Sequence, residues 1–337
     1  MLNKAFIDLS ALKSNARKVK GKLKSGVLMS AVVKADAYGH GAPMVANALN
    51  GICDSFSVAL LEEGVELRLS GIDKEIHVLT PFFDQDLPRA IHYNLIATVE
   101  SVEQVKKINA QSLMQNRITG VYVKFNTGMN RLGVSSMQEL KAILECITLS
   151  ENVKLKGMFS HFAAPDNKKL ANFQQNKFLL ANNLVKGYNN KAVCHMSASG
   201  GFLNGFYADM VRIGILLYGY KPFESDKVNL SPVMKVYAPV IHSRRLEKGE
   251  SALYGVKIAD SKKDIDIIRY GYADGLMRKE CFGQFNNRCM DMTAVDGGGG
   301  KWYPVMTDAD IVAKKYHTIS YEVLTKAALR AEKIYLN

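Results

Sequence analysis

The chain has little cysteine and no long apolar runs. Its five cysteines, Cys53, Cys146, Cys194, Cys281 and Cys289, are odd in number, widely spaced and without a CxxC pair. This pattern argues against a disulfide framework or a metal site and fits a reducing compartment. No apolar run reaches the roughly 18 residues that a membrane span needs, and residues 1–18 lack the apolar core of a signal peptide. We therefore expect a cytoplasmic protein without a membrane partner.

The fraction of charged residues, 23%, is ordinary, and the charged residues are not clustered in one segment. The formal net charge is +12, with lysines spread over many segments rather than massed in one patch. Dispersed charge argues against nucleic acid as a partner and favours the encounter of small anionic ligands. The length of 337 residues and the 47% hydrophobic fraction permit two domains, or one large barrel with an addition.

Short apolar runs alternate with longer amphipathic runs from about residue 28 onward, which is typical of βα units and a parallel sheet. We expect helices between successive strands, over 43–49, 61–69, 86–92, 101–114, 137–148, 168–188 and 201–207. We expect strands over 28–33, 55–60, 76–80, 95–99, 120–125, 155–160, 192–196 and 210–212. The pattern predicts an α/β fold, a (β/α)8 TIM barrel with its active site at the carboxyl ends of the strands.

The rhythm changes after residue 220. Strands are expected in close succession over 233–246, 251–258 and 265–272, with no long helix until residue 311. The barrel is therefore predicted over 10–226, followed by a smaller, mostly-β domain over 227–337. A further strand at residues 4–9 precedes the barrel pattern and could pair with this second domain.

The chain is organised around Ser30–Gly41, SAVVKADAYGHG, where an apolar run ends in Lys34. A lysine at a strand end usually extends into solvent, but a desolvated lysine loses its charge readily and suits Schiff-base chemistry. The phrase KADAYGHG closely resembles the lysine motif of the alanine racemase family. Those enzymes hold pyridoxal 5′-phosphate (PLP) on this lysine. The resemblance implies that Lys34 holds PLP and is catalytic, and that Tyr38 lies in the cofactor site.

A second motif follows in Val121–Val134, VYVKFNTGMNRLGV. It resembles the family segment in which an arginine faces the substrate carboxylate and a carbamylated lysine orients that arginine. The resemblance assigns these roles to Arg131 and Lys124. Asn126 stands where the family often has aspartate, which removes one negative charge near Lys124.

Three more segments resemble cofactor-binding motifs of the family. His161 ends a strand, and Ser199 precedes a predicted helix; Ala198, beside it, replaces the asparagine usual in the family. In the segment DMVRIGILLY, Arg212 corresponds to the arginine on the pyridine nitrogen of PLP. The backbone N–H groups of Gly214 and Ile215 correspond to those that hold the phosphate, where barrel enzymes commonly bind one. Because a guanidinium only donates hydrogen bonds, that nitrogen stays unprotonated and the ring is a weaker electron sink.

The second domain carries the remaining matches. Tyr254 resembles the catalytic tyrosine of the family, although Leu253 replaces the usual serine before it. Tyr272, in YGYADG, matches a motif at the substrate entrance. Met290 and Asp291 resemble a substrate-binding CMDQ segment, and Tyr321 matches a TxSYE motif. Between residues 278 and 287 the chain is about ten residues shorter than the family pattern.

The resemblance implies an amino-acid racemase that interconverts L-alanine and D-alanine and supplies D-alanine for peptidoglycan. Lys34 and Tyr254 are expected to act as bases on opposite faces of the substrate. A phenol with an ordinary pKa of about 10 would need that pKa lowered to act near neutrality. The tyrosine would come from a second subunit, so we expect a homodimer with shared sites.

Three alternatives remain at this stage. Racemases of serine or lysine share these motifs. A PLP decarboxylase of related architecture is disfavoured, since that family places an acidic residue rather than Arg212 on the pyridine nitrogen. A PLP-carrier protein is also disfavoured, because such proteins resemble a lone barrel.

Overall fold

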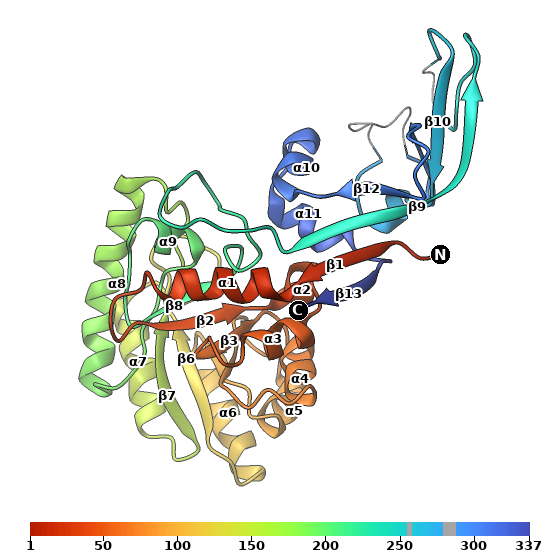
Figure 1. Cartoon of the computed structure of the whole chain (residues 1–337). Helices are drawn as coiled ribbons and strands as arrows, with labels where there is room; N and C mark the ends of the chain where they lie inside the picture. The colour runs from red at the N-terminus through yellow and green to blue at the C-terminus, as the bar shows by residue number, and fades with distance from the viewer. Residues whose placement is uncertain (255–257, 279–287) are drawn as a thin grey trace.

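The computed structural model describes residues 1–254, 258–278 and 288–337. It contains a barrel of parallel strands surrounded by helices and, beside it, a unit built on a second sheet (Figure 1). The chain begins in the second sheet, builds the barrel and returns to that sheet. One continuous hydrophobic core contains residues of both units, including Leu12, Phe56, Val236 and Leu324. The two units are therefore packed as one body.

Parallel strands form the barrel wall, as expected. They are β2 (Leu28–Val32), β3 (Ser55–Val58), β4 (Ile76–Val78), β5 (Ala97–Val99), β6 (Thr119–Lys124), β7 (Val153–Phe159) and β8 (Met210–Ile213). β8 pairs with β2, β2 with β3 and β3 with β4, while β5, β6 and β7 pair in order. A single bridge between His77 and Ile96 joins the two sets.

The remaining part of the wall differs from the expectation of a strand over 192–196. Its one bridge joins Phe159 and His195, and backbone hydrogen bonds run on both sides of it. Toward β7 the N–H groups of Val193, His195 and Ser160 donate across the pair, and toward β8 the N–H groups of Asp209 and Arg212 donate to the carbonyls of Cys194 and Ser197. The backbone N–H of Cys194 donates to the Asp209 carboxylate at 2.7 Å instead of to a neighbouring strand. On the β8 side a side chain thus takes the place of one backbone partner, and the barrel closes through backbone hydrogen bonds that form no regular strand ladder there.

Helices cover the outside of the barrel (Figure 1). They are α1 (Leu9–Lys20), α3 (Ala42–Leu49), α4 (Leu61–Leu69), α5 (Leu87–His92) with the short η1 (Asp84–Asp86) before it, α6 (Val102–Met114), α7 (Met137–Thr148), α8 (Lys168–Tyr188) and α9 (Ser199–Leu203). Ser101, Ser136 and Asn167 cap α6, α7 and α8 by accepting a backbone N–H. The expected helix over 201–207 is wrong in its bounds: α9 ends at Leu203, and Gly205 has φ of 79°.

The second sheet has the order β11-β10-β9-β1-β13, with β12 also paired to β9. Its members are β1 (Lys4–Asp8), β9 (Met234–Leu246), β10 (Lys263–Ile268), β11 (Thr293–Asp296), β12 (Trp302–Met306) and β13 (Glu332–Leu336), with η2 (Tyr272–Asp274), α10 (Ala309–Tyr316) and α11 (Ser320–Ala327). The prediction that the first strand pairs with this unit is confirmed, because β1 lies between β9 and β13. Beyond β1, β9 and β10 form an arm that extends away from the barrel (Figure 1).

The expected strand over 251–258 is wrong where the structure describes it. Ser251 and Ile258 form one antiparallel bridge, so the chain reverses between them. Leu253 adopts φ of 58°, which a strand does not allow. Residues 255–257 of this prediction, and Cys281 with the shortened segment near it, lie outside the described residues.

Candidate active site

Lys34 begins an unusual turn at the carboxyl end of β2. In α2 (Lys34–Gly39), the four residues Ala35–Tyr38 have φ between 52° and 55°, so the turn is left-handed. Left-handed helical geometry costs L-residues about 1–2 kcal/mol each, and such strain collects at functional sites. Two carboxylates hold the turn: Glu63 accepts the Ala35 N–H at 2.5 Å, and Asp36 accepts the Ala42 N–H at 2.7 Å.

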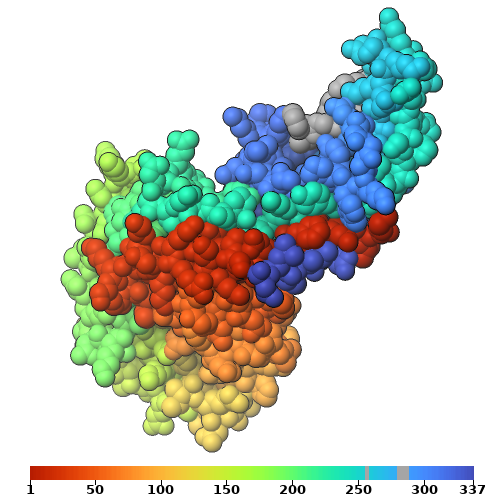
Figure 2. Space-filling model, viewed as in Figure 1, coloured from red at the N-terminus to blue at the C-terminus, as the bar shows by residue number. Residues whose placement is uncertain are grey.

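A cavity of about 650 Å³ opens at this end of the barrel. It is lined by barrel loops and by the N-terminal part of α11, and it lies where the space-filling view is hollowed between the two units (Figure 2). Ten residues singled out from the sequence line it: Lys34, Tyr38, Lys124, Arg131, His161, Ser199, Arg212, Gly214, Ile215 and Tyr321. The structure therefore brings together residues separated by nearly 300 positions.

The cavity is strongly basic. Four cationic side chains, Lys34, Lys124, Arg131 and Arg212, line it, whereas Glu322 is the one acidic residue among the described residues of the lining. Burial, and then the charge of Arg131, lowers the pKa of Lys34. Burial, followed by Arg212 and Arg131, holds the pKa of Lys124 well below its ordinary value. Such a cavity favours anions and makes both lysine amines readily uncharged.

Arg212, on β8, is buried, and several acceptors hold its guanidinium. Its guanidinium donates to the Ser160 carbonyl at 2.7 Å, to the Met196 carbonyl at 3.2 Å, to Nδ1 of His161 at 3.2 Å and to Nδ1 of His195. Burial lowers the pKa of Arg212 to about 9, so it keeps its proton at neutral pH. Burial and this guanidinium keep the pKa of His161 well below its ordinary range, so His161 is a neutral acceptor.

The opposite side of the cavity carries hydroxyl groups and a glycine. Ser199 Oγ accepts the Gly214 N–H at 3.2 Å, and the rings of Tyr38 and Tyr321 are 6.0 Å apart. A Cβ atom at position 214 would lie 2.5 Å from the Tyr38 hydroxyl, so the backbone can approach only with glycine there. Burial raises the pKa of Tyr321 to about 12, which keeps it a neutral donor. These groups suit a phosphate.

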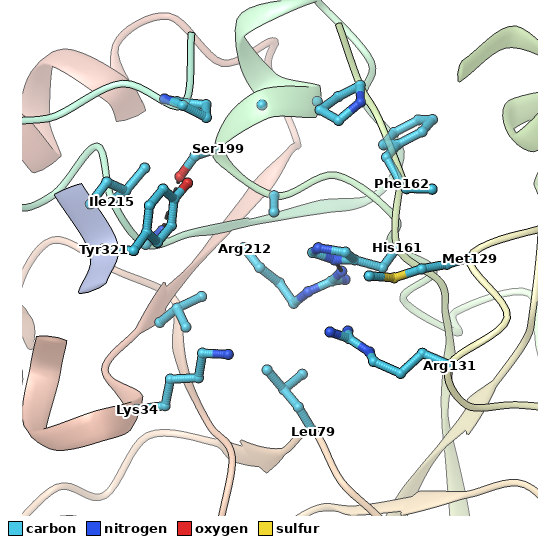
Figure 3. Close-up of a pocket in the computed structure, with 18 of the residues that line it drawn as sticks. Lys34, Leu79, Met129, Arg131, His161, Phe162, Ser199, Arg212, Ile215 and Tyr321 are labelled. Carbon is cyan, nitrogen blue, oxygen red and sulfur yellow. Dashed lines mark hydrogen bonds between the residues drawn. The ribbon is translucent and has the colours of Figure 1, made fainter. Parts of the chain in front are cut away.

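Figure 3 shows how these side chains share one space. Lys34, Arg131 and Arg212 point into the centre of the cavity, while Ser199 and Tyr321 lie together on the left of the view. One ligand could therefore place an anionic group against the hydroxyl groups and a second group against the Lys34 amine, with Arg212 beside it in the same cavity. Among the described residues there is no group of three or more His, Cys, Asp or Glu that could hold a metal ion.

The other predicted site residues do not reach this cavity in the same chain. Tyr254 is 70% exposed and lies in the connection at the far end of the β9–β10 arm. Tyr272 and Met290 are also exposed, at 40% and 55%, and Asp291 forms an ion pair with Arg330 at 2.9 Å. All four are on the surface of the second unit, away from the lining of the cavity.

Several lining residues were not found from the sequence. Leu79, Met129, Phe162 and Pro165 contribute apolar wall, and His195, outside the lining, contacts the Arg212 guanidinium through its Nδ1. Leu79 directly follows β4 and His195 forms the bridge to Phe159, so their position in the barrel is a usable signal. Met129, Phe162 and Pro165 lie in loops whose course the sequence does not indicate.

The fold and the site define a class of protein. This is a parallel-barrel enzyme with a lysine in a basic cavity at the carboxyl ends of the strands and a second sheet domain beside that cavity. Comparison with family models narrows the class. Residues 7–222 match the model of the alanine racemase N-terminal domain, and residues 233–335 match that of the C-terminal domain. The chain belongs to the alanine racemase family.

Individual relatives agree over nearly the full length. The chain is 34% identical to an alanine racemase of Pasteurella multocida and 31% identical to one of Treponema denticola, with 99% of this chain and 98% of each relative covered. Among solved structures, an alanine racemase of Clostridium difficile 630 has a TM-score of 0.94 at 30% identity, with 100% of this chain and 96% of that one covered. One from Bartonella henselae, described with covalently bound pyridoxal phosphate, has a TM-score of 0.86 at 27% identity, and both chains are fully covered. The predicted fold class and family are confirmed.

Proposed function

We propose that this protein is a PLP-dependent racemase that interconverts L-alanine and D-alanine in the cytoplasm and so supplies D-alanine for peptidoglycan. The observation that carries the proposal is that Lys34, just after strand β2, and Arg212, on strand β8, line one cavity. Membership of the alanine racemase family supports the substrate, and the basic lining suits both a phosphate and a carboxylate.

The residues of the cavity fit PLP as its resident group. Lys34 would hold the aldehyde carbon, Arg212 would donate to the pyridine nitrogen, and Ser199, Gly214, Ile215, Tyr38 and Tyr321 would hold the phosphate. His161 would support Arg212 through the 3.2 Å contact of its Nδ1. When bound, PLP withdraws electrons from the substrate and so acidifies the hydrogen on Cα.

The side chains of the cavity bind the substrate and transfer its proton. Arg131, which is exposed and lines the cavity, binds the substrate carboxylate, and Lys124 behind it orients Arg131 as a carbamate. The Lys34 amine exchanges a proton with Cα on one face, which its lowered pKa favours near neutrality. Inversion at Cα needs a second base on the opposite face.

Tyr254 supplies that second base from the partner in a homodimer. Its 70% exposure on the arm, away from the cavity of its own chain, supports a contribution to another subunit. Tyr272, Met290 and Asp291, on the same surface of the second unit, would line the substrate entrance of the partner cavity with it.

Racemisation is tested by following optical rotation with PLP-loaded protein and L-alanine. Equal amounts of the two enantiomers are expected at equilibrium. Lys34→Ala protein should form no D-alanine, so the optical rotation of the L-alanine solution should not change. L-serine and L-lysine, run in parallel, should react more slowly, and carbon dioxide release should be absent. Protein that binds PLP but racemises serine or lysine in preference to alanine, or releases carbon dioxide, contradicts the proposal.

A further inference from the structure

A set of polar and aromatic side chains lies inside the barrel beneath Arg212. The rings of His77, Tyr122, Phe159 and His195 are in mutual contact, with centroid distances between 4.6 and 6.4 Å. Both histidines are buried, His77 at 3% exposure and His195 at 0%. Interiors of such barrels are usually filled by Val, Ile and Leu, so two buried imidazoles there require an explanation.

The hydrogen bonds of Thr98 fix the tautomer of His77. The Thr98 hydroxyl donates to the Val78 carbonyl at 2.7 Å, and it lies 3.0 Å from Nε2 of His77. A hydroxyl has one hydrogen, so Thr98 must accept from His77 and Nε2 must carry the proton. Nδ1 of His77 is then an acceptor, and it is buried without a partner among the described residues.

Arg212 fixes the tautomer of His195 in the same way. A guanidinium only donates, so Nδ1 of His195, which contacts Arg212, is an acceptor and Nε2 carries the proton. That Nε2–H is buried and has no acceptor among the described residues. His195 thus offers an unused donor where His77 offers an unused acceptor.

We propose that His195 donates its Nε2–H to Nδ1 of His77, directly or through one water, and that His77 is thereby a positioning residue for Arg212. The ring centroids are 5.9 Å apart and the planes cross at 78°. A direct N–H···N bond needs roughly 5 Å between ring centres, so a small rotation or a single water completes the contact. The result is a one-directional chain of donors that runs from Arg212 through His195, His77 and Thr98 to the Val78 carbonyl.

The chain deepens the proposed function and rests on it, because Arg212 is there assigned to the pyridine nitrogen. His195 cannot rotate without losing either Arg212 or His77. Both terminal nitrogens of the guanidinium are thus held by fixed acceptors, which sets the orientation of the whole group in the cavity lining. Buried hydrogen bonds that continue in one direction also polarise one another, which strengthens the Arg212–His195 contact.

Nitrogen-15 NMR of the purified protein tests the tautomers without any reaction. His77 and His195 should both appear as neutral Nε2–H imidazoles, and the His195 Nε2–H should be shifted downfield and exchange slowly with water. An Nδ1–H form of either ring overturns the proposal. Since this measurement uses the unaltered protein and no substrate, its result is independent of whether alanine is racemised.

Two substitutions separate the acceptor from the donor of His77. In His77→Asn the amide oxygen occupies roughly the place of Nδ1, whereas in His77→Gln the amide nitrogen replaces Nε2. The slow exchange of the His195 proton should survive in His77→Asn and be lost in His77→Gln. Release of PLP should be about three- to tenfold faster in His77→Gln and nearly unchanged in His77→Asn. Equal behaviour of the two variants in both measurements overturns the positioning role.

Discussion

Single residues in the cavity owe their charge states to burial rather than to ion pairs. Lys124 is 5% exposed, and its Nζ lies 4.2 Å from the centre of the Phe159 ring. Its amine faces Arg131 and Arg212, and no carboxylate is bonded to it among the described residues. A neutral form of Lys124 therefore relieves repulsion, and a negatively charged form would attract both arginines.

We expect Lys124 to react with carbon dioxide. An uncharged amine adds to carbon dioxide, forms the N–C bond and releases a proton, which leaves a carbamate beside Arg131. Protein equilibrated with ¹³C-bicarbonate should show one carbamate carbon resonance, and Lys124→Arg protein should show none. Asn126 in place of aspartate removes a competing negative charge and does not prevent the reaction. A folded wild-type protein without this resonance contradicts the expectation.

The buried His40 predicts a loss of stability in acid. Burial lowers the pKa of His40 to about 4, whereas an unfolded histidine has a pKa of about 6.5. Between these values the unfolded chain binds a proton that the folded chain does not. The contribution of His40 is complete above about pH 6.5 and declines as the pH falls toward about 4.

His40→Asn should remove this part of the pH dependence. The amide can still donate to the carbonyls of Ala37 and Tyr38, which Nδ1 of His40 contacts at 2.9 and 3.0 Å, but it does not titrate. Between about pH 7 and about pH 5 the wild type should lose about 2 kcal/mol more unfolding free energy than the variant. Urea unfolding at both pH values measures the difference, and equal losses would refute it.

Among the elements, the left-handed turn Ala35–Tyr38 departs most from what the sequence allows one to predict. Ala and Tyr rarely adopt φ near 52°, and four such residues in succession depend on Glu63 and on the ion pair of Asp36 with Lys333 at 2.7 Å. Contacts made nearly 300 residues apart in the chain cannot be inferred from local propensity.

Glycine at position 35 should therefore not destabilise the protein. Ala35 is exposed and has φ of 52°, a geometry that glycine adopts without strain. Ala35→Gly should leave the unfolding free energy unchanged or raise it by up to about 1 kcal/mol. The matched control is Ala110→Gly on the exposed face of α6, which should cost about 0.5–1 kcal/mol. Equal losses in thermal or urea unfolding would contradict the strain argument.

The regular elements were predictable because their patterns are long and internally consistent. The amphipathic runs 61–69, 137–148 and 168–188 were predicted with the bounds that α4, α7 and α8 have. The run 192–196 bonds to β7 but is not a regular strand, since on the β8 side the Cys194 N–H donates to the Asp209 carboxylate rather than to a backbone carbonyl. Motif residues located the cavity, whereas His77 gave no signal, since a histidine in a short apolar run does not reveal which neighbours it meets inside a barrel.

At the scale of the whole molecule, one part of the second unit lines the cavity of its own barrel and another part extends away from that barrel. Tyr321, on α11, lines the cavity of its own barrel. Tyr254 lies on the connection between β9 and β10, at the end of an arm that extends away from that barrel (Figure 1). A cavity assembled only from its own chain has Lys34 without Tyr254. Isologous pairing of two chains would give each cavity both residues, because each arm can meet the partner barrel.

Co-expression of two inactive chains tests this arrangement. In a dimer of one Lys34→Ala chain and one Tyr254→Phe chain, one cavity combines an intact Lys34 with an intact Tyr254 and the other has neither. Random pairing makes about half of the dimers mixed, so about one quarter of wild-type racemisation should return. The control pairs Lys34→Ala with Arg131→Ala: both residues line the cavity of the same chain, so every cavity in a mixed dimer lacks one of them and activity should stay at the level of the single variants. No recovery in the test pair would mean that Tyr254 does not act across the subunit boundary, and equal recovery in the control would mean that the recovered activity is not evidence of a shared cavity.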